Sequence, residues 1–130
     1  MQDLQITSTT VTQSVPLNGF FDIAIDYNNV GDTKYKANEI EVVISIPSGF
    51  KMLKIKKAGE HFNWRYDKVN DVIIGINRKS LPAKNFGGVV CSFRALQQGM
   101  KTFITNTSFP KGANNEDTDN DSIAHIIKVI

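Results

Sequence analysis

The sequence has a single cysteine, Cys91, among its 130 residues. An internal disulfide is therefore impossible, and a structural zinc site built from several cysteines is excluded. No apolar run approaches the roughly 18 residues that a membrane-spanning helix needs. The opening residues, MQDLQITST, have neither the basic segment nor the apolar core of a signal peptide. We therefore expect no membrane insertion, and either a cytoplasmic protein or a piece of a longer exported chain.

A strong excess of one charge is also missing, as are the familiar catalytic patterns. Lysine and arginine number 15 against 13 carboxylates, so the formal charge is +2, whereas a nucleic-acid-binding domain is expected to be strongly basic. The two histidines, His61 and His125, are far apart, and the sequence has no His-Glu-x-x-His, no Gly-x-Ser-x-Gly and no phosphate-binding glycine loop. We expect neither an enzyme nor a nucleic-acid partner.

Alternation of apolar and polar residues is the main pattern that the sequence does contain. Apolar residues make up 41% of the chain and charged residues 22%, which suits one globular domain spanning residues 1–130. The stretch FFDIAIDYNN alternates as a strand with one buried face does. EIEVVISIP, DVIIGI, GGVVCSFRAL, KTFITNTSF and SIAHIIKV repeat the pattern, and turn-forming residues separate them. An all-β antiparallel sandwich or barrel is predicted.

The phase of the alternation predicts which side chains face the core. They are Phe21, Ile23, Ile25, Tyr27, Ile40, Val42, Ile44, Ile46, Val89, Cys91 and Phe93. At its position Cys91 is expected to be a buried thiol that behaves as a small apolar group. His125 is in phase with Ile127 and Val129, which predicts a partly buried imidazole with a backbone hydrogen bond.

Several short motifs, taken in order, resemble the Ig-like repeat domains of bacterial surface and secreted proteins. They are Asp3-Leu4, Gly19 before FFDIAIDYNNVG, the Pro-x-Gly turn of ISIPSGF, GEHFNW, LPAKNFGGVVCSFRALQQG, Asn106 and DTDNDSIAHIIKV. The order matches the "domain of unknown function eleven" type, with the cell-adhesion-related bacterial domains as relatives. Two departures are the basic strand KMLKIKK and the missing turn glycine beside the acidic cluster.

This resemblance implies an Ig-like β-sandwich of about seven to nine antiparallel strands. It also implies a non-catalytic spacer or adhesion module of a larger cell-surface or secreted protein, located outside the cell. Its partners would then be neighbouring domains of the same polypeptide. The family has no common catalytic residue set, and the resemblance implies no ligand.

Two neighbouring stretches of the sequence have a second interpretation as a binding surface. Trp64 and Tyr66 share one face of a strand, so with Arg65 they could form an aromatic platform for a glycan; equally, their rings could belong to the core. The basic run that begins with KMLKIKK could bind a polyanion, or its lysines could protect a sheet edge from pairing with other chains. The binding alternatives describe a carbohydrate- or protein-binding module of an exported enzyme or adhesin. A third alternative is an assembly subunit that exchanges strands with its neighbours.

The acidic stretch NNEDTDND raises the question of a metal. Glu116, Asp117, Asp119 and Asp121 are spaced like the start of a calcium loop, in which alternating carboxylates converge on one ion. A helix-loop-helix site would need glycine at Ser122 and glutamate at Lys128, and a strand is predicted to follow. The other interpretation is a solvated turn shaped by side-chain-to-backbone hydrogen bonds. The sequence therefore leaves two possibilities, a calcium ion or no cofactor.

Overall fold

The protein is described here by a computed structural model that covers residues 2–8, 12–110 and 122–130. These residues form strands and turns, and none of them forms a helix long and apolar enough to cross a membrane. The ten strands are β1 (Leu4–Thr7), β2 (Thr12–Val15), β3 (Phe20–Asn29), β4 (Glu41–Ser45), β5 (Phe50–Ala58), β6 (Phe62–Asp67), β7 (Val72–Asn77), β8 (Phe86–Ala95), β9 (Gly99–Ser108) and β10 (Ser122–Val129).

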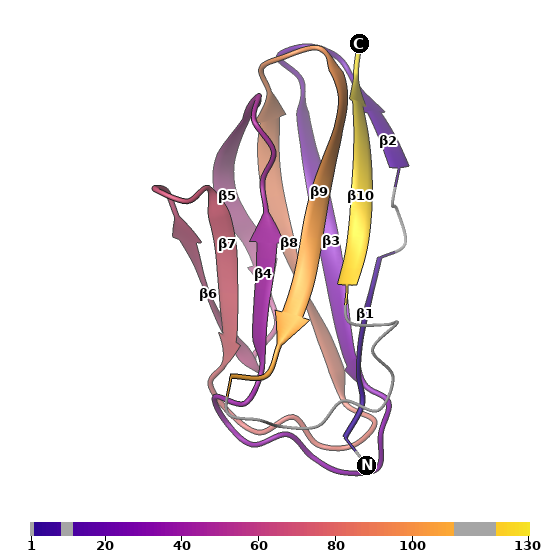
Figure 1. The fold of residues 1–130 in the computed structure, drawn as a ribbon, viewed down its shortest axis with the longest axis vertical. Helices are drawn as coiled ribbons and strands as arrows, with labels where there is room; N and C mark the ends of the chain where they lie inside the picture. Colours follow the sequence, from indigo (N-terminus) through magenta and orange to yellow (C-terminus); the bar gives the residue numbers. More distant parts are fainter. Residues whose placement is uncertain (1, 9–11, 111–121) are drawn as a thin grey trace.

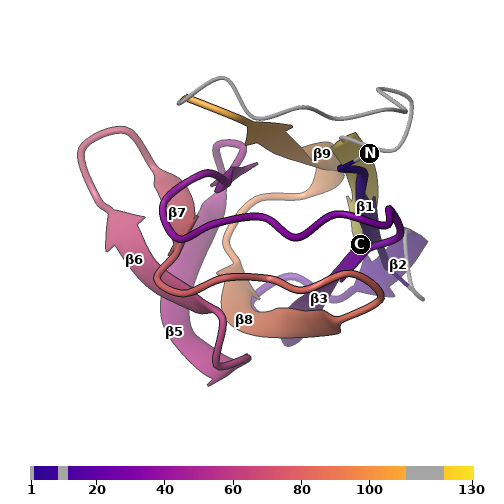
Figure 2. The ribbon, with the colours of Figure 1, turned by 90° about the horizontal axis from the view of Figure 1, so that it is seen from below.

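The strands form two sheets that stack face to face (Figures 1 and 2). The four-stranded sheet has the order β1-β3-β8-β5, and the six-stranded sheet has the order β2-β10-β9-β4-β7-β6. Among the described strands, β2 and β10 are the one parallel pair. This arrangement confirms the predicted Ig-like sandwich, because alternate residues of both sheets meet in one core.

The strand number is higher than predicted because short, polar strands are hard to recognise. β2 reads TQSV, and Val15 is its single buried residue. Its strand geometry comes from pairing with β10, a partner more than a hundred residues away. β1 and β2 follow each other in sequence, yet β1 joins the four-stranded sheet and β2 the six-stranded sheet. Local alternation cannot reveal such an arrangement.

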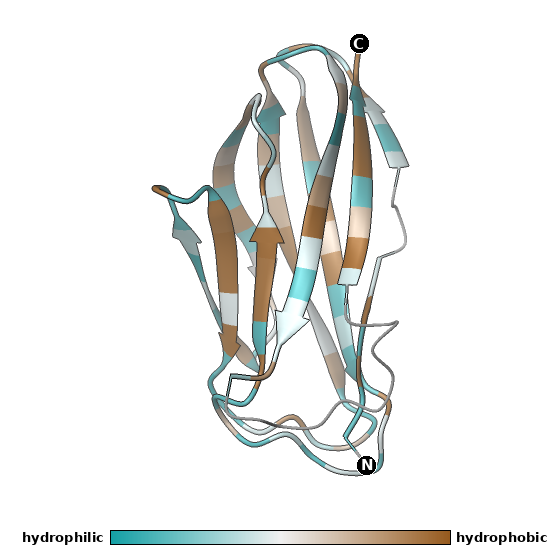
Figure 3. Cartoon of the chain, viewed as in Figure 1, coloured by the Kyte–Doolittle hydropathy of each residue, from teal (hydrophilic) through white to brown (hydrophobic). Residues whose placement is uncertain are grey.

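The predicted core is confirmed at every position named. All eleven predicted residues are buried, from Phe21 on β3 to Phe93 on β8. A cluster of four phenylalanines lies between the sheets, with Phe103 at 4.9 Å from Phe50, 5.0 Å from Phe93 and 6.0 Å from Phe21, measured between ring centroids. Figure 3 shows the same alternation as brown and pale or teal bands on β9 and β10, whereas β4 and β7 are brown along most of their length.

Two buried asparagines hold the loops at the end of the sandwich where β3 stops. Asn77 Oδ1 accepts from the Ile40 amide at 2.9 Å, and its Nδ2 donates to the carbonyls of Lys36 and Lys79 at 2.8 and 3.2 Å. Asn29 makes the equivalent set, donating to two loop carbonyls and accepting from the Gly31 amide. Each side chain bonds to three backbone groups of separate loop positions, which supplies partners for polar groups of the buried or half-buried loops.

Replacing Asn77 by alanine is expected to lower the free energy of unfolding by about 2–3 kcal/mol, because at least one buried amide and one buried carbonyl lose their partners. For a domain of this size the melting temperature should fall by roughly 10 °C. Thermal denaturation followed by circular dichroism measures the effect. The control is Asn63→Ala, at an exposed position on β6, and equal melting temperatures for the two variants would contradict the assigned role of Asn77.

Candidate functional site

Trp64, Tyr66 and Arg65 lie on the edge strand of the six-stranded sheet, but they do not share a face. Trp64 is opposite Gly75 and Tyr66 is opposite Ile73, and both rings pack against the core. Arg65 points to the other side of β6 and is exposed. A glycan platform made of all three side chains therefore has no common surface, and a binding role for them stays a prediction.

The position of the Trp64 ring depends on a glycine. A Cβ atom at Gly75 would overlap the ring, so the absence of a side chain lets the indole lie flat across β7. The ring also stacks on Phe62, with 5.4 Å between centroids.

Tyr66 closes the β6–β7 hairpin by donating its hydroxyl proton to Asp71 Oδ1 at 2.6 Å, and this bond to a carboxylate raises the pKa of Tyr66 to about 12. These contacts have a structural function.

The basic run forms β5, the edge strand of the four-stranded sheet. Its register with β8 shifts twice, between Met52 and Lys54 and again between Ile55 and Lys57. Lys51, Lys54 and Lys56 are exposed, while Met52 and Ile55 pack against the core. Bulges and lysines on an edge both oppose pairing with another chain, which agrees with the structural interpretation of this run.

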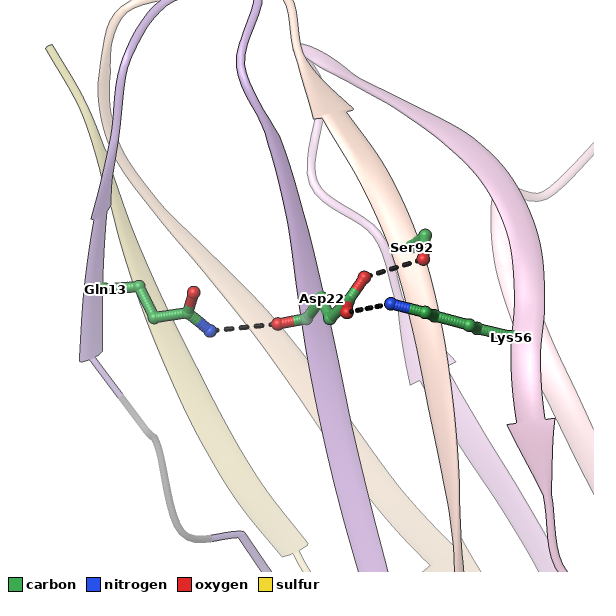
Figure 4. A network of polar contacts seen from close by, with 4 residues as sticks. All are labelled: Gln13, Asp22, Lys56 and Ser92. Atoms are coloured by element: carbon green, nitrogen blue, oxygen red, sulfur yellow. Dashed lines mark hydrogen bonds and ion pairs between the residues drawn. The ribbon is translucent and has the colours of Figure 1, made fainter.

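A network of polar contacts crosses the outer face of the four-stranded sheet (Figure 4). Lys56 Nζ lies 3.0 Å from Asp22 Oδ2, and the Ser92 hydroxyl donates to Asp22 Oδ1 at 2.6 Å. The hydrogen bond from Ser92, followed by that from Lys56, lowers the pKa of Asp22. Both charged side chains are about half exposed, so the ion pair contributes no more than about 1 kcal/mol. The network links β3, β8 and β5 without forming an enclosed site.

His61 is held by a buried tyrosine at the end of the core. The Tyr27 hydroxyl lies 3.0 Å from His61 Nδ1, and burial raises the pKa of Tyr27 to about 12. Burial also lowers the pKa of His61, which favours the neutral imidazole in the folded protein. A Cβ atom at Gly87, the residue opposite Tyr27 on β8, would overlap the hydroxyl. The two glycines whose Cβ atoms would meet the Tyr27 hydroxyl, Gly59 and Gly87, also line a surface hollow of about 320 Å³.

His125 differs from its prediction in two respects, its burial and its hydrogen bonding. It lies in phase with Ile127 and Val129 as expected, but it is completely buried, and none of the described residues hydrogen-bonds to either ring nitrogen. Burial lowers its pKa. The predicted backbone bond is absent, and the imidazole lies on the same buried face of β10 as Ile127 and Val129.

Cys91 is fully buried, as predicted. Burial, with a smaller contribution from the Asp22 carboxylate, raises the pKa of the thiol to about 12. A thiol with that pKa is protonated and unreactive at neutral pH. Cys91 therefore serves as an apolar core residue.

The proposed calcium ligands Glu116, Asp117, Asp119 and Asp121 lie outside the described residues, so calcium binding stays a prediction. Within residues 2–8, 12–110 and 122–130, no three His, Cys, Asp or Glu side chains come together as a metal site.

If a calcium ion binds the acidic loop, a hundredfold excess over its dissociation constant should stabilise the fold by about 2.7 kcal/mol. Thermal melts in chelator and in millimolar calcium test this, with Asp117→Asn/Asp119→Asn as the control variant. Superimposable melts of the unmodified protein would leave the loop as a solvated turn.

The most apolar surface that sequence reasoning did not identify is the outer face of the six-stranded sheet. Val43 on β4 lies beside Ile74 on β7, and Ile104 on β9 lies one row away beside Ala124 on β10. Ile76 and Ile104 are 36% and 37% exposed. Near its β6 edge this face has a hollow of about 230 Å³ lined by Asn38, Asn63, Trp64, Arg65, Ile74, Ile76 and Arg78. The uninterrupted apolar run of DVIIGI was the available signal, since a strand with one wet face should alternate.

Comparison with solved structures finds the same sandwich fold in CARDB, cohesin and pilin domains. The CARDB domain of PF1109 from Pyrococcus furiosus aligns with 99% of this chain and 94% of its own length, with a TM-score of 0.62 and 12% identity. A type I cohesin in complex with a dockerin, from Clostridium thermocellum, aligns with 100% of this chain and 96% of its own, with a TM-score of 0.53 and 13% identity. BcpA, the major pilin subunit of Bacillus cereus, gives a TM-score of 0.60 at 8% identity, and the match spans 39% of that protein.

No family model matches the sequence, and no curated protein matches it. Structural similarity at such low identity establishes the fold. The expected likeness to Ig-like domains of surface proteins is therefore confirmed at the level of the fold, and no sequence family is shown. The chain is an all-β sandwich similar to CARDB, cohesin and pilin domains.

Proposed function

We propose that this chain is a non-catalytic structural module of a larger cell-surface or secreted protein, which joins its neighbours end to end. The observation that carries the proposal is the position of the two ends. The described chain starts at one end of the long axis of the sandwich and Ile130 lies at the other (Figure 1). Domains with this geometry extend a chain when they are linked in series, whereas adjacent ends would fold it back.

Two further observations support the proposal. The buried titratable side chains Cys91, Tyr27 and Tyr35 belong to the hydrophobic core, and His125 is buried on the same face of β10 as Ile127. The similar solved structures include a cohesin and a pilin subunit, and the same architecture would suit an extracellular stalk or scaffold.

The experiment is to tag the full-length protein in its native organism and to treat intact cells with a protease. Surface exposure should remove the tag from intact cells, while a cytoplasmic control protein survives. Small-angle X-ray scattering of two copies linked in series should give a maximum dimension close to double that of one copy. A tag protected inside intact cells would overturn the surface assignment, and a compact two-domain particle would overturn the end-to-end arrangement.

A protein-binding role is a second candidate, favoured by the apolar outer face of the six-stranded sheet. Exposed apolar patches on soluble monomers often mark interaction sites. Arg65 and Arg78 flank Ile74 and Ile76 in the hollow at its edge, and Arg78 is held in place by donating from Nε to the Glu60 carbonyl at 2.8 Å. Arginine beside apolar side chains is typical of interface centres. The matching partner would offer apolar side chains next to carboxylates.

The test uses short synthetic peptides that alternate leucine with aspartate or glutamate, and the same peptides with lysine as the control. Methyl NMR signals of Ile74 and Ile76 should shift with the acidic peptides and not with the basic ones. Arg65→Glu should abolish the shift without changing the melting temperature, because Arg65 is exposed. Equal responses to both peptides, or none, would argue against this candidate.

Strand exchange between copies stays a prediction, and a monomer at all concentrations in light scattering would contradict it.

A further inference from the structure

β2 and β10 form the one parallel strand pair in the described part of the chain, and they lie near its two ends. Residues Thr12–Val15 are in register with Ile126–Val129. Two backbone bonds extend the pairing beyond the strands: the Ile130 amide donates to the Val15 carbonyl at 3.0 Å, and the Leu17 amide donates to the Ile130 carbonyl at 2.9 Å. The N-terminal segment is therefore bonded directly to the C-terminal strand.

Parallel pairing decides how these strands respond to tension. Both strands point toward the C-terminal end of the long axis (Figure 1). A pull on the two ends of the chain draws β2 back toward the N-terminal end and draws β10 the opposite way, along the strand axes. All hydrogen bonds between the two strands are then strained together. Had the load entered at one end of an antiparallel pair, the bonds would break one after another.

Other contacts reinforce the N-terminal segment against the same movement. β1 pairs with β3 over Leu4–Thr7, so the segment is bonded to both sheets. Gln13 Nε2 donates to the Asp22 carbonyl at 3.0 Å, which ties β2 to β3 across the sheet boundary (Figure 4). Val15 and Val129 are both buried. Their burial keeps water from competing for the adjoining backbone bonds.

From this geometry we propose that β2, β10 and Gln13 form a mechanical clamp, so that the domain has the further function of resisting force applied between its ends. A use for that resistance in the cell depends on the proposed role as a surface module. The clamp itself is a property of the isolated domain. Interior pairs such as β6 and β7 do not lie between the two points of load, so they do not contribute to it.

A matched pair of proline variants isolates the clamp. In a parallel ladder alternate residues turn their backbone groups toward the same neighbour. The Val15 carbonyl bonds to β10, so Gln13 also faces β10, whereas the amide of Ser14 faces away from it at the sheet edge. Gln13→Pro removes a clamp bond together with the side-chain bond to Asp22, and Ser14→Pro places the same ring one residue along without removing either. Gln13→Ala removes only the side-chain tie to Asp22.

The experiment is single-molecule force spectroscopy of the domain held between marker domains. Because it lacks a clamp bond, Gln13→Pro should unfold about tenfold faster than Ser14→Pro at the same force. The unfolding rate of Gln13→Ala should lie between the rates of the two proline variants. The unmodified domain should also resist an end-to-end pull better than a pull between Ile130 and a thiol at Val69→Cys, an exposed turn position, because that load bypasses β2. The buried Cys91 does not interfere with attachment.

Equal unfolding rates for the two proline variants would overturn the clamp, as would equal resistance in the two pulling directions. The melting temperatures of the two proline variants measure general destabilisation. A decrease in melting temperature that both variants share does not affect the comparison of their unfolding rates. A negative result in this experiment does not affect the proposal that the domain joins its neighbours end to end. A negative result in the protease experiment on whole cells does not affect the proposal that the domain resists force.

Discussion

Phe103→Ala is expected to lower the free energy of unfolding by about 3–5 kcal/mol, the usual cost of emptying a phenylalanine site in a close-packed core. Phe103 has no exposed surface, and its ring contacts those of Phe21, Phe50 and Phe93. The substitution removes three aromatic contacts at once and leaves a cavity between the two sheets. Domains of this size have a total stability of roughly 5–15 kcal/mol, so the variant should retain little margin. Urea denaturation at 25 °C measures the difference.

The matched control for this prediction is Phe86→Ala. Phe86 lies on β8 and is 73% exposed, so its removal should change stability by no more than about 0.5 kcal/mol. The same chemical change is thereby compared at a buried and at an exposed position. Similar losses in the two variants would mean that the aromatic cluster is not the centre of the core.

His125→Leu is expected to stabilise the domain. The imidazole is fully buried without a hydrogen bond from the described residues, and a buried polar group without a partner costs about 1–3 kcal/mol. Leucine has a similar volume and no polar atoms. At pH 7 the variant should therefore be more stable than the unmodified protein by roughly that amount.

The advantage of His125→Leu should grow in acid. Burial lowers the pKa of His125 below the ordinary value of 6.5. Just below pH 6.5, His125 is therefore protonated in the unfolded chain but still neutral in the folded protein. The contribution of the neutral histidine to stability is complete above pH 6.5, and it is lost as the pH falls through the depressed pKa, by up to about 1.4 kcal/mol per pH unit. Melts between pH 7 and pH 5 measure this slope, and the leucine variant should have a flatter one.

A control separates His125 from the other groups that titrate in acid. His61 also has a pKa lowered by burial. The variant His61→Gln therefore measures how much His61 contributes to the dependence of stability on pH. The carboxyl groups with lowered pKa values, Asp22 and Asp67 among them, lose their contributions at lower pH. If His125→Leu and the unmodified protein had parallel stability curves between pH 7 and pH 5, His125 would have to be protonated or hydrogen-bonded in the folded state.

The fold was predictable to the extent that strands alternate. β3, β4 and β8 have apolar residues at alternating positions, as does β10 apart from His125, and burial of that face is the largest favourable term in folding. β2 could not be predicted, because TQSV has no such face and becomes a strand through its bonds to β10. The outer face of β4 and β7 could not be assigned either, since continuous apolar runs do not reveal which side is covered.

The candidate binding residues show a similar division. That Trp64 and Tyr66 share a face followed from the two-residue repeat, but the choice between core and solvent depended on Gly75 across the strand and on Phe62 beside it. The phase of His125 also followed from its neighbours, and its lack of a hydrogen bond did not. Asn29 and Asn77 gave no usable signal, because an asparagine near a turn is ordinary and its three partners lie on separate loops.

By itself the sequence determined the class of fold, the inward face of most strands and the unreactive state of the one cysteine, because those properties follow from periodicity and composition. The tertiary structure alone decided that the N-terminal segment is divided between the two sheets, that β2 runs parallel to β10 and that the two ends of the chain lie at opposite ends of the sandwich. Those features depend on contacts between residues far apart in the sequence, such as Leu4 with Asn29 and Thr12 with Ile126. Their energies are properties of the assembled sheets, and no local stretch of sequence contains them.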